Sequence, residues 1–462
     1  MYNIVMLKRK IEEKILQWYN TERHKVLFID GPRQVGKSFI IQKLGKEKFK
    51  NFVEFNFIEE SGLIPALSGI KSFDEFILKL SAIKDLKDDS DETLIFLDEI
   101  QELEEVDIIS LIKFISIESK RCFAISGSLL GVSIKNYKSW PLGYIYSIEM
   151  NSLDFEEFMW AFNVSLNVIN HLKESFECSK EVDPLIHEKM SELFSLYIIL
   201  GGMPEVIEEY IRSKSFTKCD DKLKQINNYY EKDVSKYQSL DSKLYIEEIY
   251  NLIPSELNNK NKRFILKNLN EYTKFNKYDS SFIWLNKAGV TITTYNVSSL
   301  SIPLMISKER TLFKLFSYDT GLLINQFNDP TLKIKVLNKT DNINFGSIYE
   351  NVIAKELYVH GYKNLFYYNS KKHGELDFVI EDKGKVIPIE VKSGKDYDIH
   401  HALNNVFDIY SELEKGYVFY NGNVQVKGKV IYLPLYMIMY FDNQKEDESL
   451  DDLILDFSAL SK

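Results

Sequence analysis

Eight consecutive residues near the N-terminus have the types and spacing that bind the phosphates of a nucleotide. The series consists of Gly31, Pro32, Arg33, Gln34, Val35, Gly36, Lys37 and Ser38. In such a loop the backbone N–H groups surround the phosphates, and the lysine supplies positive charge to the outer ones. The hydroxyl after the lysine ligates Mg²⁺. We therefore predict that these residues and Phe39 bind ATP, with Lys37 acting in catalysis and Ser38 holding Mg²⁺.

Two flanking segments supply the context that a phosphate-binding loop needs. The apolar run 25–29 predicts a buried strand before the loop, and residues 39–44 predict the start of a helix after it. The free N–H groups at a helix start attract phosphate. A loop that matched by chance would not be expected to have both a strand before it and a helix after it. The two flanking segments therefore favour nucleotide binding.

A pair of acids follows a second apolar strand. Residues 93–97 lead directly into Asp98 and Glu99. Asp98 can hold Mg²⁺ beside Ser38, and Glu99 can polarise the attacking water. The alternative is a solvated strand end. The phosphate-binding loop upstream favours catalysis.

The strand predicted at 121–125 ends in small polar residues, Ser126 and Ser128. In P-loop ATPases of the AAA type this strand end carries a sensor for the γ-phosphate, so either serine is a candidate. We assign Ser128 to nucleotide binding, and a plain turn is the alternative. Strands that alternate with helices predict a parallel sheet with helices on both faces. The phosphate site then lies at the carboxyl ends of the strands.

The C-terminal region carries a second set of residues that can do chemistry. Asp377 lies in one predicted strand, and Glu390 and Lys392 share a face of the next. Asp377 and Glu390 can converge on one Mg²⁺, while Lys392 orients or deprotonates a water that attacks a phosphodiester. This arrangement resembles the PD-(D/E)XK nuclease family, in which the first helix often supplies another acid, here Glu350.

Fold and activity are separate questions at this second site. Because Asp377, Glu390 and Lys392 are all present, the resemblance implies metal-dependent cleavage of DNA. The alternative is a nuclease-like domain that serves binding or assembly. The nearby residues 371–373 can contact a phosphate or form an ordinary exposed turn.

Between the two constellations the pattern predicts a winged helix. Short helices at 264–269 and 281–285 precede a strand at 289–295, and residues 253–256 predict a turn. Residues 255–290 hold seven Lys or Arg against three acids, which favours contact with DNA. A solvated face on a purely structural module is the alternative.

Several motifs in order resemble a family of prokaryotic AAA-type ATPases with an uncharacterised C-terminal region. They are GPRQVGKS, LIFLDEIQ, ISGSLLG, PLGYIYSIEMNSLDFEEF and GGMPEV, followed by YEKDVSKY, IPSELNNKNKRF and FKLFSYDTGLL. The resemblance covers nearly the whole chain. Members usually have arginine where Tyr144 stands, so a nucleotide-sensing arginine is lost or replaced. Four arginines are candidates for that role, namely Arg33, Arg121, Arg212 and Arg263.

Bulk properties set the class of protein. The chain has 462 residues, 45% of them hydrophobic, and a formal charge of −10, so it is predicted to form several domains without a general polyanion-binding surface. Its three cysteines match no zinc pattern and fit a reducing compartment. The longest apolar run, 431–441, is too short to span a bilayer. We expect a cytoplasmic protein that makes no contact with a membrane.

These observations combine into one α/β architecture. We predict an AAA-type P-loop ATPase core at 1–150, a helical lid at 151–238, a winged helix at 239–335 and a restriction-nuclease-like domain at 336–462. The predicted function is Mg²⁺-dependent hydrolysis of ATP, with the C-terminal half acting on DNA. An ATP-gated, metal-dependent DNA nuclease is one alternative. The other is a nucleotide-operated switch or scaffold with an inactive nuclease-like domain, which works with a protein partner or as an oligomer.

Overall fold

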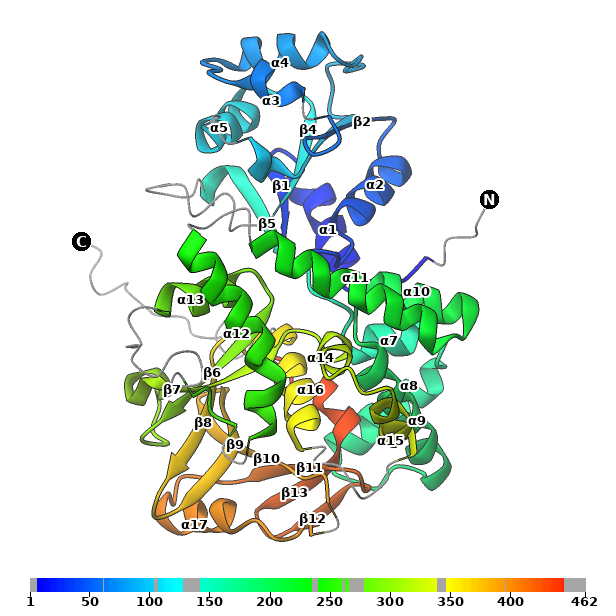
Figure 1. Cartoon of the computed structure of the whole chain (residues 1–462). Helices are drawn as coiled ribbons and strands as arrows, with labels where there is room; N and C mark the ends of the chain where they lie inside the picture. Colours follow the sequence, from blue (N-terminus) through cyan, green and yellow to red (C-terminus); the bar gives the residue numbers. More distant parts are fainter. Residues whose placement is uncertain are drawn as a thin grey trace, which may run out of the picture.

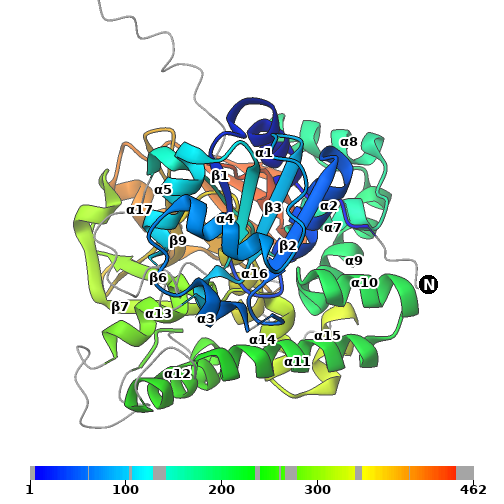
Figure 2. The same ribbon diagram turned by 90° about the horizontal axis from the view of Figure 1, so that it is seen from above.

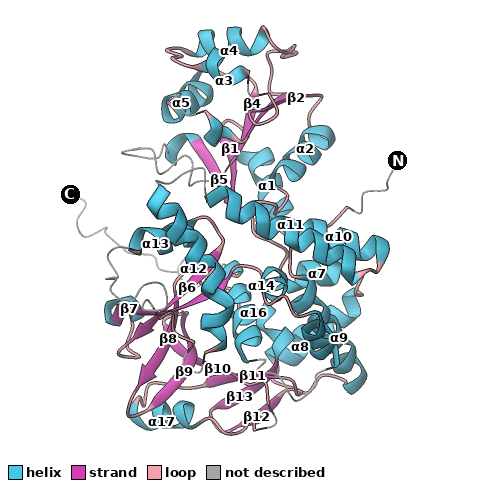
Figure 3. Cartoon of the chain, viewed as in Figure 1, coloured by secondary structure: helices cyan, strands magenta, loops and turns pink. Residues whose placement is uncertain are grey.

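The computed structural model describes residues 6–60, 62–103, 107–127, 142–234, 240–259, 262–265, 278–338, 346–394 and 396–443. An N-terminal unit built on strands β1 to β5 lies at the top of Figure 1, and a larger C-terminal sheet lies at the bottom. In Figure 3 the strands form two separate groups, with helices between and beside them.

The N-terminal sheet is parallel and has five strands in the order β2-β3-β4-β1-β5. Their bounds are β1 (Val26–Asp30), β2 (Asn51–Asn56), β3 (Thr93–Asp98), β4 (Cys122–Ser126) and β5 (Ile145–Glu149). The predicted parallel sheet is therefore confirmed. Since β4 lies between β1 and β3, the residue that ends β4 lies between the phosphate-binding loop and the two acids.

Helices cover both faces of this sheet, as predicted (Figure 2). One face packs against α1 (Ile11–Gln17) and α2 (Lys37–Lys48), and the other against α4 (Phe73–Ser81) and α5 (Ile108–Glu118), with α3 (Leu63–Leu67) beside α4. Alternate residues of β1 enter the two cores: Leu27 joins the α1–α2 core, and Phe28 joins the α4–α5 core. This alternation follows from the period of two in a strand.

Among the described residues, six helices follow the sheet. They are α7 (Phe155–Ala161), α8 (Leu166–Glu177), α9 (Pro184–Leu200), α10 (Pro204–Ser213), α11 (Phe216–Val234) and α12 (Leu240–Asn258). Within the described residues no single helix is long and apolar enough to cross a membrane, and only the sharply bent pair α9 and α10 meets that test when taken together.

Helix α12 overturns one local prediction. Residues 253–256 lie inside the helix, with Pro254 in its last two turns, whereas the sequence predicted a turn. A proline inside a helix removes one backbone hydrogen bond and costs about 3 kcal/mol. Here Ile246, Ile249, Ile253 and Leu257 lie on one face and are fully buried, so their packing outweighs that cost.

The C-terminal sheet has eight strands in the order β12-β13-β11-β10-β9-β8-β6-β7. Their bounds are β6 (Thr291–Val297), β7 (Lys308–Ser317), β8 (Leu365–Ser370), β9 (Gly374–Asp382), β10 (Lys385–Val391), β11 (Gly416–Tyr420), β12 (Gln425–Lys427) and β13 (Val430–Pro434). The hairpin expected in the winged helix is present as β6 and β7. It extends this sheet, because β6 also pairs in parallel with β8 across the boundary predicted at 335/336.

In the part of the chain that the structure describes, five further helices lie before and between these strands. They are α13 (Asp279–Lys287), α14 (Thr320–Gln326), α15 (Pro330–Asn338), α16 (Gly346–Val359) and α17 (His401–Ile409). Helix α16 is buried along almost its whole length and packs against β6, β7, β8 and β10. The winged helix and the nuclease-like domain stay predictions, and part of the segment 264–269 lies outside the described residues.

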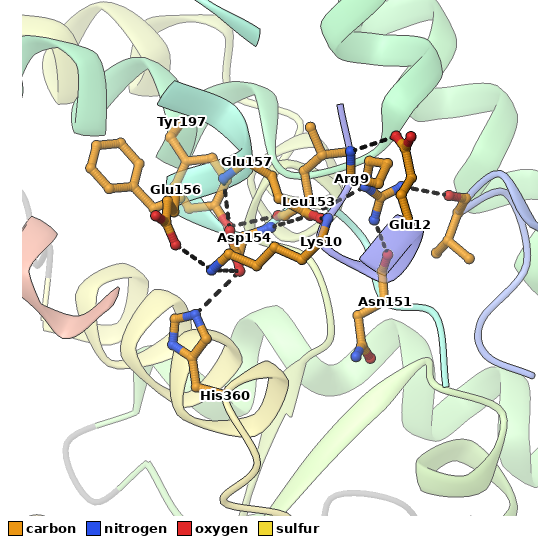
Figure 4. A network of polar contacts seen from close by, with 12 residues as sticks. Arg9, Lys10, Glu12, Asn151, Leu153, Asp154, Glu156, Glu157, Tyr197 and His360 are labelled. Carbon is orange, nitrogen blue, oxygen red and sulfur yellow. Dashed lines mark hydrogen bonds and ion pairs between the residues drawn. The ribbon is translucent and has the colours of Figure 1, made fainter. Parts of the chain in front are cut away.

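A buried capping arrangement at the start of α7 holds the N-terminal segment (Figure 4). Asp154 caps the helix by accepting a hydrogen bond from Glu157 N at 2.8 Å, and Glu157 accepts one from Asp154 N at 3.3 Å. Lys10 Nζ lies 2.7 Å from Asp154 Oδ2, and Arg9 Nε lies 3.2 Å from Glu157 Oε2. The two carboxylates therefore begin a helix and also bind a distant part of the chain.

Helix α16 reaches the same junction from the C-terminal half. Just beyond its end, His360 Nε2 lies 3.2 Å from Asp154 Oδ2. Glu356 Oε2 accepts a hydrogen bond from Phe155 N at 3.3 Å, and Tyr197 OH of α9 donates to Glu356 Oε1 at 2.6 Å. The N-terminal segment, the helices after the first sheet and the C-terminal half thus meet at one polar cluster.

Replacing Asp154 by Asn tests this junction, because asparagine still caps a helix but carries no charge. Burial alone would raise the pKa of Asp154, but Lys10 and His360 hold that pKa well below its usual range. We expect Asp154→Asn to lower the free energy of unfolding by ~3 kcal/mol at neutral pH, as for other broken buried ion pairs. Urea unfolding measures the change.

The pH dependence of that loss has a defined sign. A carboxylate with a lowered pKa stabilises the fold above about pH 4, and this stability is lost as the pH falls through the folded-state pKa. The difference between wild type and Asp154→Asn should therefore shrink in acid. Asp183→Asn is the control, since Asp183 caps α9 from an exposed position. Equal losses in both variants would contradict the role of the charge.

Candidate functional site

The predicted phosphate-binding loop joins β1 to α2. Gly31 has φ 138°, and a side chain there would place Cβ 2.0 Å from Met150 O, so only glycine fits beside the end of β5. Gly36 precedes α2 with φ 96°, and no side chain caps the first N–H groups of that helix. The helix start is therefore open to an anion, as a phosphate site requires.

Lys37 lies inside its own loop. Its Nζ donates hydrogen bonds to Gly31 O at 2.9 Å and to Pro32 O at 2.7 Å, and the side chain is buried. Burial lowers the pKa of Lys37, and the charges of Glu99 and Asp30 oppose that change. Its two acceptors are neutral carbonyls, so phosphate oxygens, whose negative charge attracts the ammonium group, can compete for it.

Asp98 lies beside Ser38, as predicted, within a set of hydrogen bonds. Its Oδ2 accepts from Asn56 Nδ2 at 3.0 Å, and its Oδ1 accepts from Ser126 Oγ. Burial raises the pKa of Asp98, while hydrogen bonds from Ser126 and Ser38 lower it. Mg²⁺ takes one or two protein oxygens together with phosphates and water, so Ser38 and Asp98 form a suitable partial ligand set.

Two neighbours of these acids were missed in the sequence. Asn56 ends β2 in register with Asp98, and Gln101 donates through Nε2 to Glu99 Oε2. The contact between Asn56 and Asp98 can be known only from the order of the strands. The contact between Gln101 and Glu99 depends on a backbone turn in which Glu99 has φ 57°. Ser126 contacts Asp98, whereas Ser128 lies outside the described residues.

An apolar cavity adjoins the loop. Its lining includes Leu7, Val35, Phe39, Ile40, Met150 and Pro204, from the N-terminal segment, the loop, α2, the end of β5 and α10. Arg9 borders this cavity and holds the loop, because its NH1 donates to Val35 O at 3.1 Å and its NH2 to Asn151 O at 2.6 Å. A flat apolar group next to the phosphates can lie here.

The other side of the loop touches the chain beyond the first sheet. Tyr230 OH of α11 donates to Arg33 O at 3.1 Å. Gly289, in the turn between α13 and β6, packs so closely against Pro32 that an added Cβ would lie 2.4 Å from Pro32 Cγ. The loop is thus held between elements from both halves of the chain.

Two of the candidate arginines are engaged elsewhere. Arg121 NH1 lies 2.9 Å from Asp89 Oδ1, and Arg121 also donates to the carbonyls of Lys87 and Asp88. Arg212 pairs with Glu209 of the same helix. The identity of a nucleotide-sensing arginine stays a prediction, and of the four candidates Arg33 belongs to the loop itself.

The predicted C-terminal residues do come together. Asp377 on β9 and Glu390 on β10 lie on adjacent antiparallel strands, and Glu350 of α16 faces Asp377. Lys392 Nζ lies 2.8 Å from Glu390 Oε2. Burial and the charge of Glu350 raise the pKa of Asp377 to about 7.

Two lysines join this carboxylate cluster without having been predicted. Lys314 of β7 lies 3.4 Å from Glu350 Oε2 and 2.8 Å from Glu375 Oε1, and Lys262 binds Glu350 Oε1. The one available signal was a charged residue inside the apolar run 312–316. Among the described residues no three Asp, Glu, His or Cys side chains could together hold a metal ion. In this structure the carboxylates pair with lysines instead.

Comparisons with known families agree with the first site. Residues 23–159 match a family described as an AAA domain. Residues 191–333 and 345–438 match two domains of unknown function, DUF8612 and DUF4143. No curated protein matches the chain.

Two solved structures resemble parts of the chain at low identity. A Walker-type ATPase of Pyrococcus abyssi is 16% identical with a TM-score of 0.42, over 70% of this chain and 96% of that one. The RuvB Holliday junction branch migration motor of Thermotoga maritima is 13% identical with a TM-score of 0.21, over 41% of this chain and 73% of that one. Such distant likenesses transfer no property to this chain.

The matched family and the geometry of the loop define the class of the N-terminal unit. Residues 23–159 match the AAA domain family, and their parallel sheet carries the predicted phosphate-binding loop and the paired acids. The matched family supports the predictions of a P-loop core and of ATP binding.

The contact between Gly289 and Pro32 predicts an effect on nucleotide handling. Gly289→Ala and Gly384→Ala carry the same cost of a left-handed backbone, because their φ angles are 66° and 71°. Only the first would push against the loop, since no atom lies within 4 Å of a Cβ at Gly384. We expect Gly289→Ala to weaken binding of a fluorescent ATP analogue several-fold and Gly384→Ala to leave it unchanged. Equal effects would contradict a coupling through Pro32.

Proposed function

We propose that this chain is a Mg²⁺-dependent ATPase whose nucleotide state is passed to its C-terminal half. The observation that carries the proposal is the meeting of Lys37, Ser38, Asp98 and Glu99 at the carboxyl end of the parallel sheet. Basic, hydroxyl and acidic groups at such a place are the parts of a phosphoryl-transfer site.

Each residue has a defined task in this proposal. Lys37 leaves the carbonyls of its own loop and binds the outer phosphates. Ser38 and Asp98 hold Mg²⁺, which neutralises charge that develops on the phosphates. Glu99 accepts the proton of the attacking water or orients that water. Ser126 keeps Asp98 in place from the neighbouring strand.

The nucleotide base fits the apolar cavity next to the loop. Phe39 and Ile40 of α2 and Met150 line it, and Pro204 closes it from α10. Binding there would connect α10 to the nucleotide, which is the task expected of a lid. A helical lid at 151–238 therefore belongs to the proposal.

The contacts behind the loop provide the route to the C-terminal half. Pro32 and Arg33 lie shortly after β1, where Pro32 contacts Gly289 and Arg33 contacts Tyr230. When Lys37 exchanges its carbonyl partners for phosphate, a shift of the loop would reach Gly289 and Tyr230 before other residues outside the loop. We place the protein among nucleotide-operated switches, with DNA as the proposed target of the C-terminal half.

The basis for DNA is the basic segment 255–290, much of which lies outside the described residues. On β7, the edge strand of the C-terminal sheet, Arg310 is an exposed cation. Contact with phosphates would weaken steeply as salt rises. An ATP-gated nuclease is less favoured, because each of its predicted carboxylates already has a partner.

Two variants test the ATPase proposal. Glu99→Gln keeps the shape of the side chain but removes the base, so turnover should fall by about 10²-fold or more while nucleotide still binds. Lys37→Ala should lose both binding and turnover. Phosphate release and binding of a fluorescent ATP analogue, each with and without DNA, measure these effects. Turnover that survived in Lys37→Ala would refute the proposed site, and turnover indifferent to DNA would remove DNA as the target.

A further inference from the structure

The cluster around Glu350 and Asp377 contains a lysine, Lys314, that lies among its carboxylates. Lys314 is fully buried, and its Nζ lies 2.8 Å from Glu375 Oε1, 3.4 Å from Glu350 Oε2 and 3.9 Å from Asp377 Oδ1. A lysine is almost never fully buried unless it is paired. Burial alone would lower the pKa of Lys314, but these carboxylates raise it, so the side chain is an ammonium ion.

Every oxygen of the three expected acids is engaged by a group of the chain. Glu350 binds Lys262 through Oε1 and Lys314 through Oε2. Asp377 Oδ2 accepts a hydrogen bond from Val391 N at 2.8 Å, and its Oδ1 faces Lys314.

Glu390 is engaged in the same way. Its Oε2 pairs with Lys392, and its Oε1 accepts a hydrogen bond from Leu403 N at 3.3 Å. A divalent cation needs several oxygens that face one point without competing cations. The carboxylates of this cluster are instead divided among three ammonium groups and two backbone N–H groups.

We infer that Lys314 takes the place of the metal in this nuclease-like constellation, so that the cluster is a closed set of ion pairs rather than a metal centre. Three carboxylates, those of Glu350, Glu375 and Glu390, pair with the ammonium groups of Lys262, Lys314 and Lys392, and Asp377 Oδ1 lies 3.9 Å from Lys314 Nζ. Removing the charge of Lys314 leaves an excess of negative charge that a divalent cation can neutralise. This inference is independent of the proposed ATPase function.

The fold explains how Lys314 reaches the cluster. It lies in β7, whose partner β6 pairs with β8, and β8 pairs with the strand that carries Asp377. The hairpin thus supplies the cation from the middle of the chain. The cluster ties β7 to α16 and β9, and Lys262 ties the residues after α12 to the same place.

Binding of Mn²⁺ tests the inference directly. The measurement uses the full chain without nucleotide and with Asp98→Asn, so that the phosphate-binding loop contributes no metal site. We expect no bound Mn²⁺ by equilibrium dialysis or electron paramagnetic resonance in this parent. Adding Lys314→Met should create one site per chain, and adding Asp377→Asn to that variant should remove it.

A matched control separates this effect from general loosening of the fold. Lys333→Met also removes a buried lysine, one that pairs with Asp220 outside the cluster, and should bind no Mn²⁺. Circular dichroism establishes that each variant is folded. If Lys314→Met did not fold, the parent protein would still test the inference. Mn²⁺ that bound to the parent and was lost on adding Asp377→Asn would overturn it. A folded Lys314→Met that gained no metal would also overturn it.

Discussion

The pairing of one buried carboxylate, that of Asp154, holds the parts of this chain in place. A buried charge is costly unless partners surround it, and removing a partner leaves most of that cost unrelieved. The partners of Asp154 come from the N-terminal segment, from the helix it caps and from the residue after α16. Satisfying one charge therefore fixes three segments relative to one another. Through Arg9, which binds both Glu157 and Val35 O, the same constraint reaches the phosphate-binding loop.

The two sites with candidate chemistry hold their lysines in opposite ways. Lys37 donates to neutral carbonyls of its own loop, whereas Lys314 faces charged carboxylates on other elements. A carboxylate adds Coulomb attraction to the hydrogen bond from an ammonium group, whereas a neutral carbonyl does not. Lys37 can thus change partner when an anion arrives, while Lys314 is fixed. One site is suited to turnover, and the other to holding strands together.

The sequence was most informative where chemistry and chain order coincide. Residues 31–38 and the acids Asp98 and Glu99 could be found because each motif is a short run with its strand next to it. Asn56 could not, because its contact with Asp98 depends on β2 lying beside β3. Lys314 was missed for the same reason, since it meets Glu350 only through tertiary packing. The turn predicted at Pro254 was wrong, because burial of neighbouring side chains outweighs the usual effect of proline on a helix.

The pairing of β6 with β8 has a consequence for how the chain can be divided. A cut at 335/336, where motifs suggest a boundary, would separate two strands that share backbone hydrogen bonds. Each piece would then expose an unpaired strand edge, which is a template for aggregation. The middle and C-terminal segments therefore share one sheet. We expect insertions or fusions to be tolerated at exposed turns such as Lys383–Gly384 rather than between the matched families.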